Sequence, residues 1–546
     1  MTGTTSARLA SRPERHGSGE PDEAGLRAPV NVVILVAALA ALGLRALQLS
    51  SPHYLLGVTE YDDGVYFGSA VRFVHGVLPY RDFTMVQPPG IVLLMTPAAL
   101  LSKVAGTAWG MAAARIMTAL ASTASVVLTG LIVRHRGVLA TAIATGIMAV
   151  YLSNIVDAHT VYVEPWLVLF LLAGLVAVFD GDQIAVSRRR LLWGGAAIGF
   201  GGAVEIWAIF PVVVLVAIAL ISAGPARLRA GAMLAVGVAV GFCAPVLPFA
   251  IVAARNMYQS VISSQMNRVL PARTGLWFRL QWMTSTFREV SLARSGLIAL
   301  GLAAVVVIVG GLLLGSLLAR RLPSPLDWFA AVTTVIVAAA FLWNEQFFLH
   351  FPAFLAPFLA MALALAIARV TDGVRASRPG PRADARWLAA IAAAGSVVAF
   401  AAAQLPVVTH LKPVVSPAAV AAARRIIPPG ACVFSDQASY LIAADRFTST
   451  VPGCSEMVDP LEVGYALGHG REGDTGAGRY PAVVAVFRAA LAKAGYAWLT
   501  LRYDSRRVDW TPALRSYFRR NFIAVYTDGK RDVLYVRRTA KASAAR

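Results

Sequence analysis

The apolar residues of the chain fall into long runs separated by short polar segments. A membrane-spanning helix requires about 20 mostly apolar residues. Runs that reach or approach this length predict eleven spans, at 30–49, 108–133, 138–152, 165–179, 191–207, 208–223, 230–253, 296–319, 328–343, 351–367 and 387–403. We interpret the fifth and sixth, which form one apolar stretch, as a hairpin of two short helices.

Charged residues between the runs predict the orientation, because Lys and Arg concentrate in cytoplasmic loops. With residues 1–29 in the cytoplasm, the clusters Arg188–Arg190 and Arg320–Arg321 are cytoplasmic as well. A single helix in place of the hairpin would reverse every later loop and lose this bias. We therefore expect an integral plasma membrane protein with a cytoplasmic N-terminus and an extracytoplasmic C-terminus.

The pattern divides the chain into three parts. Residues 1–29 are rich in Ser, Arg, Glu and Pro and are expected to form a disordered cytoplasmic tail. Residues 30–403 form an α-helical polytopic membrane domain. Residues 404–546 alternate between predicted strands (431–435, 497–502, 522–526, 533–536) and predicted helices (417–427, 481–494), which indicates an extracytoplasmic α/β domain. Cys432 and Cys454 lie in this domain, either as a disulfide or as two buried thiols.

Two long loops are expected on the outer side. The first, 51–106, contains the apolar segment 91–103, which is too short to span and predicts an interfacial helix. The second, 255–295, is basic and aromatic.

Composition excludes a soluble globular protein. Of 546 residues, 58% are hydrophobic and 14% charged, against about 45–50% and about 25% in soluble domains. The formal net charge of +20 follows from cytoplasmic loops, the C-terminal domain and the basic outer loop, and we expect no nucleic-acid partner.

Carboxylates gather in the first two outer loops. Glu60-Tyr61-Asp62-Asp63-Gly64 directly follows the first span, and adjacent carboxylates at a low-dielectric boundary raise each other's pKa, which suits a general base. An Asp-rich turn that caps a helix explains the same run. Further candidates on this side, as supporting acids or acceptor-binding groups, are Asp82, Asp157, His159 and Glu164.

Basic residues on the same side are candidates for binding a lipid phosphate, because arginine contacts phosphate through two hydrogen bonds. These are Arg115, Arg268, Arg273 and His350. General anchoring to anionic lipid is the alternative for the loop, and a structural role is the alternative for His350. Asp157, His159, Asp62 and Asp63 also suggest a divalent cation, although no metal-ligand spacing enforces one.

The chain resembles the GT-C superfamily of membrane glycosyltransferases. The resemblance rests on Tyr61-Asp62-Asp63-Gly64-Val65-Tyr66, Pro79-Tyr80-Arg81-Asp82-Phe83, Pro88-Pro89-Gly90, Arg115 and Glu164-Pro165-Trp166. The similar proteins are the protein O-mannosyltransferases, the lipid A aminoarabinose transferase and the mycobacterial cell-wall mannosyl- and arabinosyltransferases.

This resemblance implies a polyprenyl-phosphate sugar as donor, with mannose favoured over arabinose. It implies inverting transfer to a hydroxyl of an envelope glycan, glycolipid or protein at the outer face. It places the acid pair on Asp62 and Asp63, with Asp62 as the base. The competing interpretation is a polytopic transporter or lipid-linked-sugar flippase, for which polar groups near the bilayer midplane would be expected.

Overall fold

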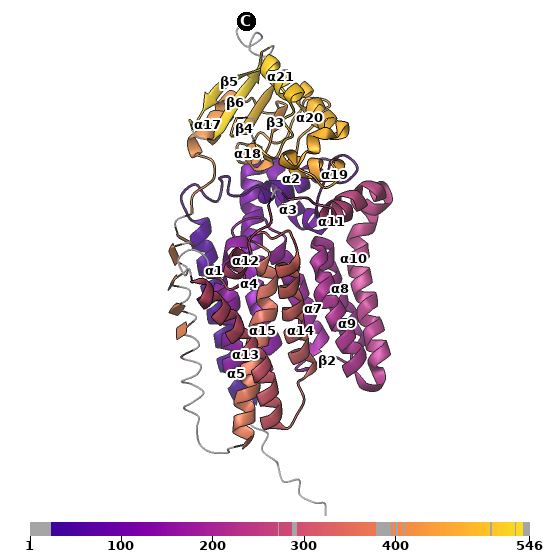
Figure 1. The fold of residues 1–546 in the computed structure, drawn as a ribbon, viewed down its shortest axis with the longest axis vertical. Helices are drawn as coiled ribbons and strands as arrows, with labels where there is room; N and C mark the ends of the chain where they lie inside the picture. The colour runs from indigo at the N-terminus through magenta and orange to yellow at the C-terminus, as the bar shows by residue number, and fades with distance from the viewer. Residues whose placement is uncertain are drawn as a thin grey trace, which may run out of the picture.

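The computed structural model is an elongated helical bundle with a small α/β domain at one end (Figure 1). It describes residues 23–270, 272–286, 292–377, 411–502, 505–529 and 531–538, with isolated positions between 392 and 409. We call the end of the bundle that contacts the α/β domain the domain end.

Long apolar helices build the bundle. Their bounds are Glu23–Leu49 (α1), Thr107–Val133 (α4), Gly137–Val150 (α5), Glu164–Val178 (α7), Arg188–Val204 (α8), Ile209–Ser222 (α9), Arg227–Tyr258 (α10), Arg294–Ala319 (α13), Pro325–Trp343 (α14) and Pro352–Ser377 (α15). Among the described residues, six helical segments are long and apolar enough to cross a membrane by themselves. The bundle therefore has the character of a polytopic membrane protein.

The predicted hairpin is present, because the backbone leaves the helical conformation at Glu205, between α8 and α9. The predicted span 387–403 lies outside the described residues apart from isolated positions, and so does most of the predicted tail 1–29. The number of eleven spans therefore stays a prediction.

Short helices cover the domain end of the bundle. Their bounds are Asp62–Val74 (α2), Gly90–Ala105 (α3), Leu152–Asp157 (α6), Ser264–Met266 (α11) and Leu276–Met283 (α12). The predicted helix at 91–103 corresponds to α3. Gly90 lets α3 approach α8, since a Cβ there would lie 2.5 Å from the Ala203 carbonyl oxygen.

The C-terminal domain is a four-stranded sheet with helices, in the strand order β3-β4-β6-β5. The strands are Val433–Ser435 (β3), Tyr496–Thr500 (β4), Phe522–Thr527 (β5) and Asp532–Arg537 (β6). The helices are Pro417–Ile426 (α17), Ala438–Ala443 (α18), Pro460–Leu467 (α19), Pro481–Lys493 (α20) and Pro512–Asn521 (α21). All predicted strands and helices of this domain are confirmed within a few residues. Cys432 and Cys454 form a disulfide.

At the opposite end of the bundle, the two-residue strands Phe179–Asp180 (β1) and Gln183–Ile184 (β2) make a hairpin. Arg136 pairs there with Asp182 at 2.8 Å and with Asp327 at 3.2 Å. These ion pairs fasten the turns that follow α4 and α7 to the start of α14.

The domain and the bundle share one hydrophobic core. Phe67 and Val71 of α2 pack in the same buried cluster as Tyr440 and Ile442 of α18. Polar contacts reinforce the joint: the Thr107 hydroxyl donates to the Ile442 carbonyl oxygen at 2.8 Å. The domain is therefore fixed to the bundle, and its residues can complete a site there.

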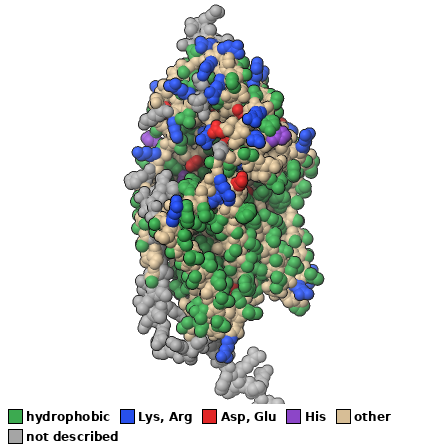
Figure 2. Space-filling view, viewed as in Figure 1, with side chains coloured by type: hydrophobic (Ala, Val, Ile, Leu, Met, Phe, Trp, Pro, Cys, Tyr) green, Lys and Arg blue, Asp and Glu red, His purple; other side chains and the backbone are tan. Residues whose placement is uncertain are grey.

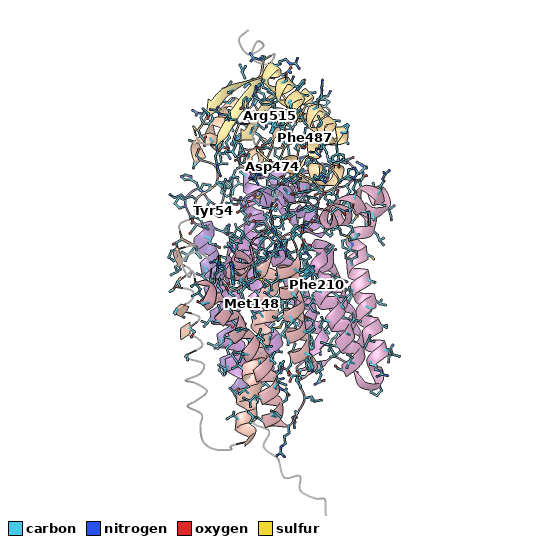
Figure 3. All side chains as sticks on the ribbon, in the orientation of Figure 1. Tyr54, Met148, Phe210, Asp474, Phe487 and Arg515 are labelled. Atoms are coloured by element: carbon cyan, nitrogen blue, oxygen red, sulfur yellow. A yellow bond between two sulfur atoms is a disulfide. The ribbon has the colours of Figure 1, made fainter. Side chains whose placement is uncertain are left out.

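The bundle and the C-terminal domain differ in the side chains on their surfaces. Figure 2 shows hydrophobic side chains covering the bundle, with Lys and Arg gathered on the C-terminal domain. Figure 3 shows Met148 and Phe210 within the bundle, Phe487 and Arg515 within the domain, and Tyr54 between the two parts. A membrane would surround the apolar part and leave the domain in water.

A substitution at Gly64 tests the packing of α2 against α18. A Cβ at Gly64 would lie 2.3 Å from the backbone nitrogen of Ser439, so Gly64→Ala must separate α2 from α18. We expect it to cost about 1–3 kcal/mol and to lower the thermal unfolding midpoint of the purified protein in detergent. Gly301→Ala is the control, because a Cβ there meets nothing within 4 Å. Equal midpoints for the two variants would contradict this docking.

Candidate active site between the bundle and the C-terminal domain

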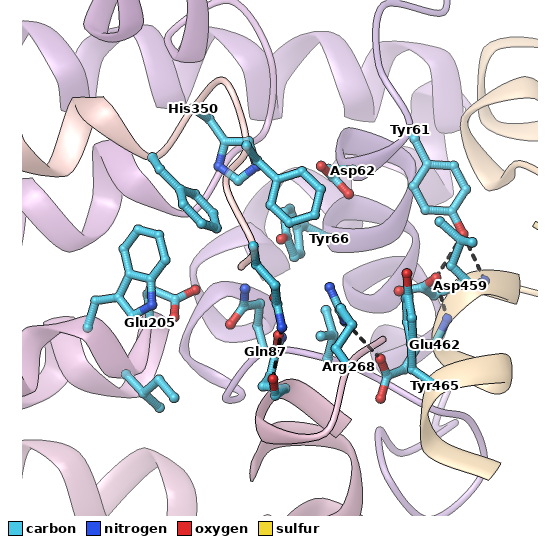
Figure 4. Close-up of a pocket in the computed structure, with 18 of the residues that line it drawn as sticks. Tyr61, Asp62, Tyr66, Gln87, Glu205, Arg268, His350, Asp459, Glu462 and Tyr465 are labelled. Carbon is cyan, nitrogen blue, oxygen red and sulfur yellow. Dashed lines mark hydrogen bonds and ion pairs between the residues drawn. The ribbon is translucent and has the colours of Figure 1, made fainter. Parts of the chain in front are cut away.

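A cavity of about 350 Å³ lies where the bundle meets the C-terminal domain. Side chains from several separate parts of the chain line it, as Figure 4 shows. The bundle contributes Asp62 and Tyr66 of α2, Glu164 at the start of α7, and Glu205 between α8 and α9. Arg268 and His350 come from two loops, and the C-terminal domain contributes Asp459, Glu462 and Tyr465. Acidic groups therefore outnumber basic ones in this lining.

The two adjacent aspartates of the Asp-Asp-Gly run have different surroundings. Asp62 begins α2 and faces the cavity, and it has no hydrogen bond or ion pair with any residue that the structure describes. Burial, with Asp459 and Glu164 nearby and only His350 opposing, raises the pKa of Asp62 to about 6. Its carboxylate is thus a free acceptor whose pKa suits proton transfer near neutral pH.

Asp63 is buried beneath the cavity and is paired. Its Oδ2 lies 2.5 Å from Arg115 and accepts a hydrogen bond from the Thr59 hydroxyl at 2.8 Å. Arg115 also donates to the carbonyl oxygens of Tyr54, Leu55 and Gly57. This pair fastens the loop before α2 to α4.

Glu164 and His350 form a second charged pair, at the wall of the cavity. The His350 Nδ1 lies 2.5 Å from Oε1 of Glu164, and the imidazole stacks on Tyr162 at 4.5 Å. Burial alone would lower the pKa of His350, but Glu164 and Asp62 raise it above its ordinary value. The second carboxylate oxygen of Glu164 is buried and has no hydrogen-bond partner in the described structure.

Asp157 and His159 lie below the cavity rather than in its lining. Both are buried, and the ring of His159 packs against Tyr54 at 5.3 Å. Burial raises the pKa of Asp157 well above its ordinary value and lowers the pKa of His159 to about 3. Both groups are therefore held neutral at neutral pH.

Arg268 is the arginine of the cavity, and the C-terminal domain holds it. Its guanidinium lies 3.5 Å from Glu462 and 4.0 Å from the centre of the Tyr465 ring. The backbone beside it is fixed too, because the Val269 amide donates to the Gly470 carbonyl oxygen at 2.7 Å. Its Nε is buried with no hydrogen-bond partner in the described residues, so the guanidinium retains a donor.

The remaining predicted residues lie elsewhere. Arg273 is outside the cavity, where its guanidinium donates to the Trp343 carbonyl oxygen at 3.0 Å. Asp82 pairs with Arg81 at 2.7 Å and lines a neighbouring cavity. Arg115 is enclosed by Asp63 and backbone carbonyls, as described above. Of the predicted phosphate-binding residues, the structure brings only Arg268 and His350 to the cavity.

The described residues contain no cluster of three or more His, Cys, Asp or Glu side chains arranged to hold a metal ion. Asp157 and His159, on which the cation hypothesis rested, do not line the cavity that Asp62 lines. We therefore assign no metal ligands.

The sequence did not point to the residues that the C-terminal domain contributes. Asp459 accepts a hydrogen bond from the Tyr61 hydroxyl at 2.7 Å across almost 400 positions of chain. Asp459 also caps α19, since its carboxylate accepts from the Glu462 amide at 3.0 Å. The run Asp459-Pro460 before an apolar segment is a helix-start signal, but no local pattern links it to Asp62.

The buried ion pair can be tested by a double-mutant cycle. Arg115→Leu leaves the Asp63 carboxylate buried without its cation, and we expect a loss of about 3–5 kcal/mol of unfolding free energy. Asp63→Asn in the same protein removes that charge, so the double variant should lose less than the two single losses added together. Detergent-solubilised protein and its denaturation midpoint supply the measurement. Strict additivity would show that the two side chains are not coupled.

No protein-family model matches the sequence, and a comparison with curated proteins finds no match. Solved structures do resemble the chain. The crystal structure of ArnT from Cupriavidus metallidurans in the apo state matches with a TM-score of 0.57 at 15% identity, over 94% of this chain and 98% of that one. The structure of ArnT bound to undecaprenyl phosphate gives the same values.

The oligosaccharyltransferase of Archaeoglobus fulgidus in the apo form matches with a TM-score of 0.51 at 13% identity, over 92% of this chain and 74% of that one. At such identities the similarity concerns the fold. It extends through the bundle and the C-terminal domain of this chain. The chain therefore has the fold of the GT-C membrane glycosyltransferases.

Proposed function

We propose that this protein is a membrane glycosyltransferase that moves a sugar from a polyprenyl-phosphate donor to a hydroxyl group. The observation that carries the proposal is that Asp62, a carboxylate with no partner among the described residues, lines the same cavity as Arg268 at the domain end of an apolar bundle. A base for the acceptor and a cation for the donor phosphate are the two groups that such a transfer requires.

The neighbours in fold support the donor class. ArnT has been crystallised with undecaprenyl phosphate, which is the lipid part of such a donor. The cavity of this chain adjoins the apolar bundle, so a lipid phosphate can reach it from the membrane. For the sugar we favour mannose over arabinose, and assays with mannosyl- and arabinosyl-phosphate lipids decide between them.

The reaction follows from the positions of these groups. The donor phosphate binds against Arg268, with the His350–Glu164 pair at the adjoining wall. The acceptor oxygen attacks the anomeric carbon while its proton passes to Asp62. The bond between that carbon and the phosphate oxygen breaks, and the phosphate leaves with the electron pair. Attack opposite the leaving group inverts the anomeric carbon.

We assign supporting roles to other predicted residues. Asp63 and Arg115 hold the loop before α2, so the first turn of the helix presents Asp62 to the cavity. Glu164 orients His350 through their 2.5 Å contact. We therefore assign the catalytic role to Asp62 alone, and positioning roles to Asp63, Arg115 and Glu164.

The location of the chemistry favours an enzyme over a transporter or flippase. A transporter places its polar site near the bilayer midplane, between two related halves. In this chain the cavity with its carboxylates lies at one end of the bundle, and the C-terminal domain closes it. We propose that this end is extracytoplasmic, with the N-terminus in the cytoplasm, as the arginine distribution predicts.

Asp62→Asn removes the proposed base and keeps the shape of the side chain. We expect transfer from a purified polyprenyl-phosphate sugar to fall by about 10²–10⁴-fold, the range for general-base catalysis, with an unchanged unfolding midpoint. Asp180→Asn is the matched control, because Asp180 is exposed in β1 at the opposite end of the bundle. Near-normal turnover by Asp62→Asn would overturn the assignment.

The pH dependence gives a separate test. Since the pKa of Asp62 is raised to about 6, the carboxylate is protonated below that pH and cannot accept a proton. We expect kcat/KM to rise with pH through a midpoint near 6 and to level off above it. The residual activity of Asp62→Asn should lack this acidic limb. An unchanged profile in that variant would assign the titration to another group.

A further inference from the structure

Arg45 is a fully buried arginine in the first helix of the bundle. It lies one turn before the domain end of α1 and is 0% exposed. Its guanidinium donates to the Ser122 hydroxyl at 3.0 and 2.8 Å and to the Ala41 carbonyl oxygen at 2.9 Å, and it forms no ion pair with any described residue. A buried charge without a counterion is costly, and an ionisable residue inside an apolar span is by default a candidate for function.

Ser122 connects Arg45 to a narrow cavity beside the proposed active site. The volume of this narrow cavity is about 10 Å³, which is close to the space that one water molecule needs. Its polar lining consists of Ser122, Ser125, Asn154 and Glu164, and the rest is apolar. Glu164 lines the active-site cavity as well, so this residue separates the two cavities.

The carboxylate of Glu164 has one paired and one unpaired oxygen. Oε1 contacts Nδ1 of His350 at 2.5 Å. Oε2 is buried and has no hydrogen-bond partner among the residues that the structure describes. Buried polar atoms almost always have a partner, either in the protein or in ordered water. A water molecule in the narrow cavity would be such a partner for Oε2.

The hydrogen bonds from Arg45 towards Glu164 can all run in one direction. Arg45 donates twice to the Ser122 oxygen, which uses both of its lone pairs, so this hydroxyl can only donate further. Within the protein it reaches the Asn154 carbonyl oxygen at 3.4 Å, which is long for an O–H···O hydrogen bond. The hydroxyl is thus available to a water molecule. Donors aligned from a cation to a carboxylate favour the ionised carboxylate.

We propose that Arg45 is a positioning residue of the active site that acts on Glu164 through Ser122 and one buried water molecule. The water accepts from the Ser122 hydroxyl and donates to Oε2 of Glu164. This link keeps Glu164 ionised and in one orientation, and Glu164 in turn holds the imidazole of His350 at the wall where the donor phosphate binds. The link itself is independent of the reaction, whereas its effect on donor binding rests on the proposed function.

A double-mutant cycle on the unfolding midpoint of the full chain in detergent tests the link. Arg45→Met removes the cation, and Glu164→Gln removes the negative charge that the cation stabilises. We expect the double variant to lose less than the two single losses added together. In a Ser122→Ala background this coupling should disappear, because the hydroxyl that carries it is absent. Additive losses, or coupling of the same size without the Ser122 hydroxyl, would overturn the proposal.

Thr129→Val is the matched control for Ser122→Ala. Thr129 is also buried on α4, but its hydroxyl donates to the Ser125 carbonyl oxygen of its own helix at 2.8 Å. We therefore expect the coupling between Arg45 and Glu164 to persist in the Thr129→Val background. Its loss there would show that the coupling does not depend on Ser122 specifically, which contradicts the proposed route.

Donor binding measures the consequence of the link for the active site. The probe is undecaprenyl phosphate, titrated onto the full chain in phosphatidylcholine nanodiscs. We expect Arg45→Met to weaken its binding about tenfold, as the loss of a cation near a carboxylate implies, and Arg45→Lys, which keeps the cation, to weaken it less. Unchanged affinity in Arg45→Met would overturn the positioning role.

The two measurements distinguish a failure of this inference from a failure of the proposed function. A wild-type chain that does not bind undecaprenyl phosphate would remove the proposed donor, and the cycle would still decide whether Arg45 and Glu164 are linked. Normal donor binding by the wild-type chain together with additive losses in the cycle would retain the proposed function and reject the link.

Discussion

The buried ion pair between Asp63 and Arg115 is the interaction on which the site depends. Hydrogen bonds to their other polar atoms help to offset the removal of two opposite charges from water. Thr59 and the carbonyl oxygens of Tyr54, Leu55 and Gly57 supply such bonds, whereas Oδ1 of Asp63 and Nε of Arg115 have no partner among the described residues. The pair thereby fixes the start of α2, and the neighbouring residue, Asp62, is held at the cavity with its carboxylate unpaired.

The C-terminal domain contributes residues to the proposed active site. It packs on α2 through a shared apolar core, and it supplies the tyrosine and glutamate that hold Arg268. A positive charge kept between a carboxylate and an aromatic face remains ordered before a ligand arrives. Such preorganisation lowers the free-energy cost of binding a ligand. Because the C-terminal domain provides it, the domain is part of the proposed active site.

The membrane takes part in the proposed reaction. A donor phosphate that binds at Arg268 would keep its lipid part in the bilayer. Such anchoring confines the donor to two dimensions and fixes its depth, which supplies part of the proximity that a two-substrate reaction needs.

Local pattern determined much of this protein from the sequence alone. Apolar runs predicted the bundle, and the arginine distribution favoured a hairpin of the runs 191–207 and 208–223. Alternation of strands and helices predicted the C-terminal domain, and the Asp-Asp-Gly run pointed to Asp62. Each of these depends on neighbours within a few residues. Tertiary structure alone decided that Asp63 and Arg115 pair beneath the site, that Asp157 and His159 lie outside it, and that Asp459 and Glu462 enter it. Those outcomes depend on contacts between residues from about 50 to about 400 positions apart, and burial then sets which charged groups are paired and which remain available for chemistry.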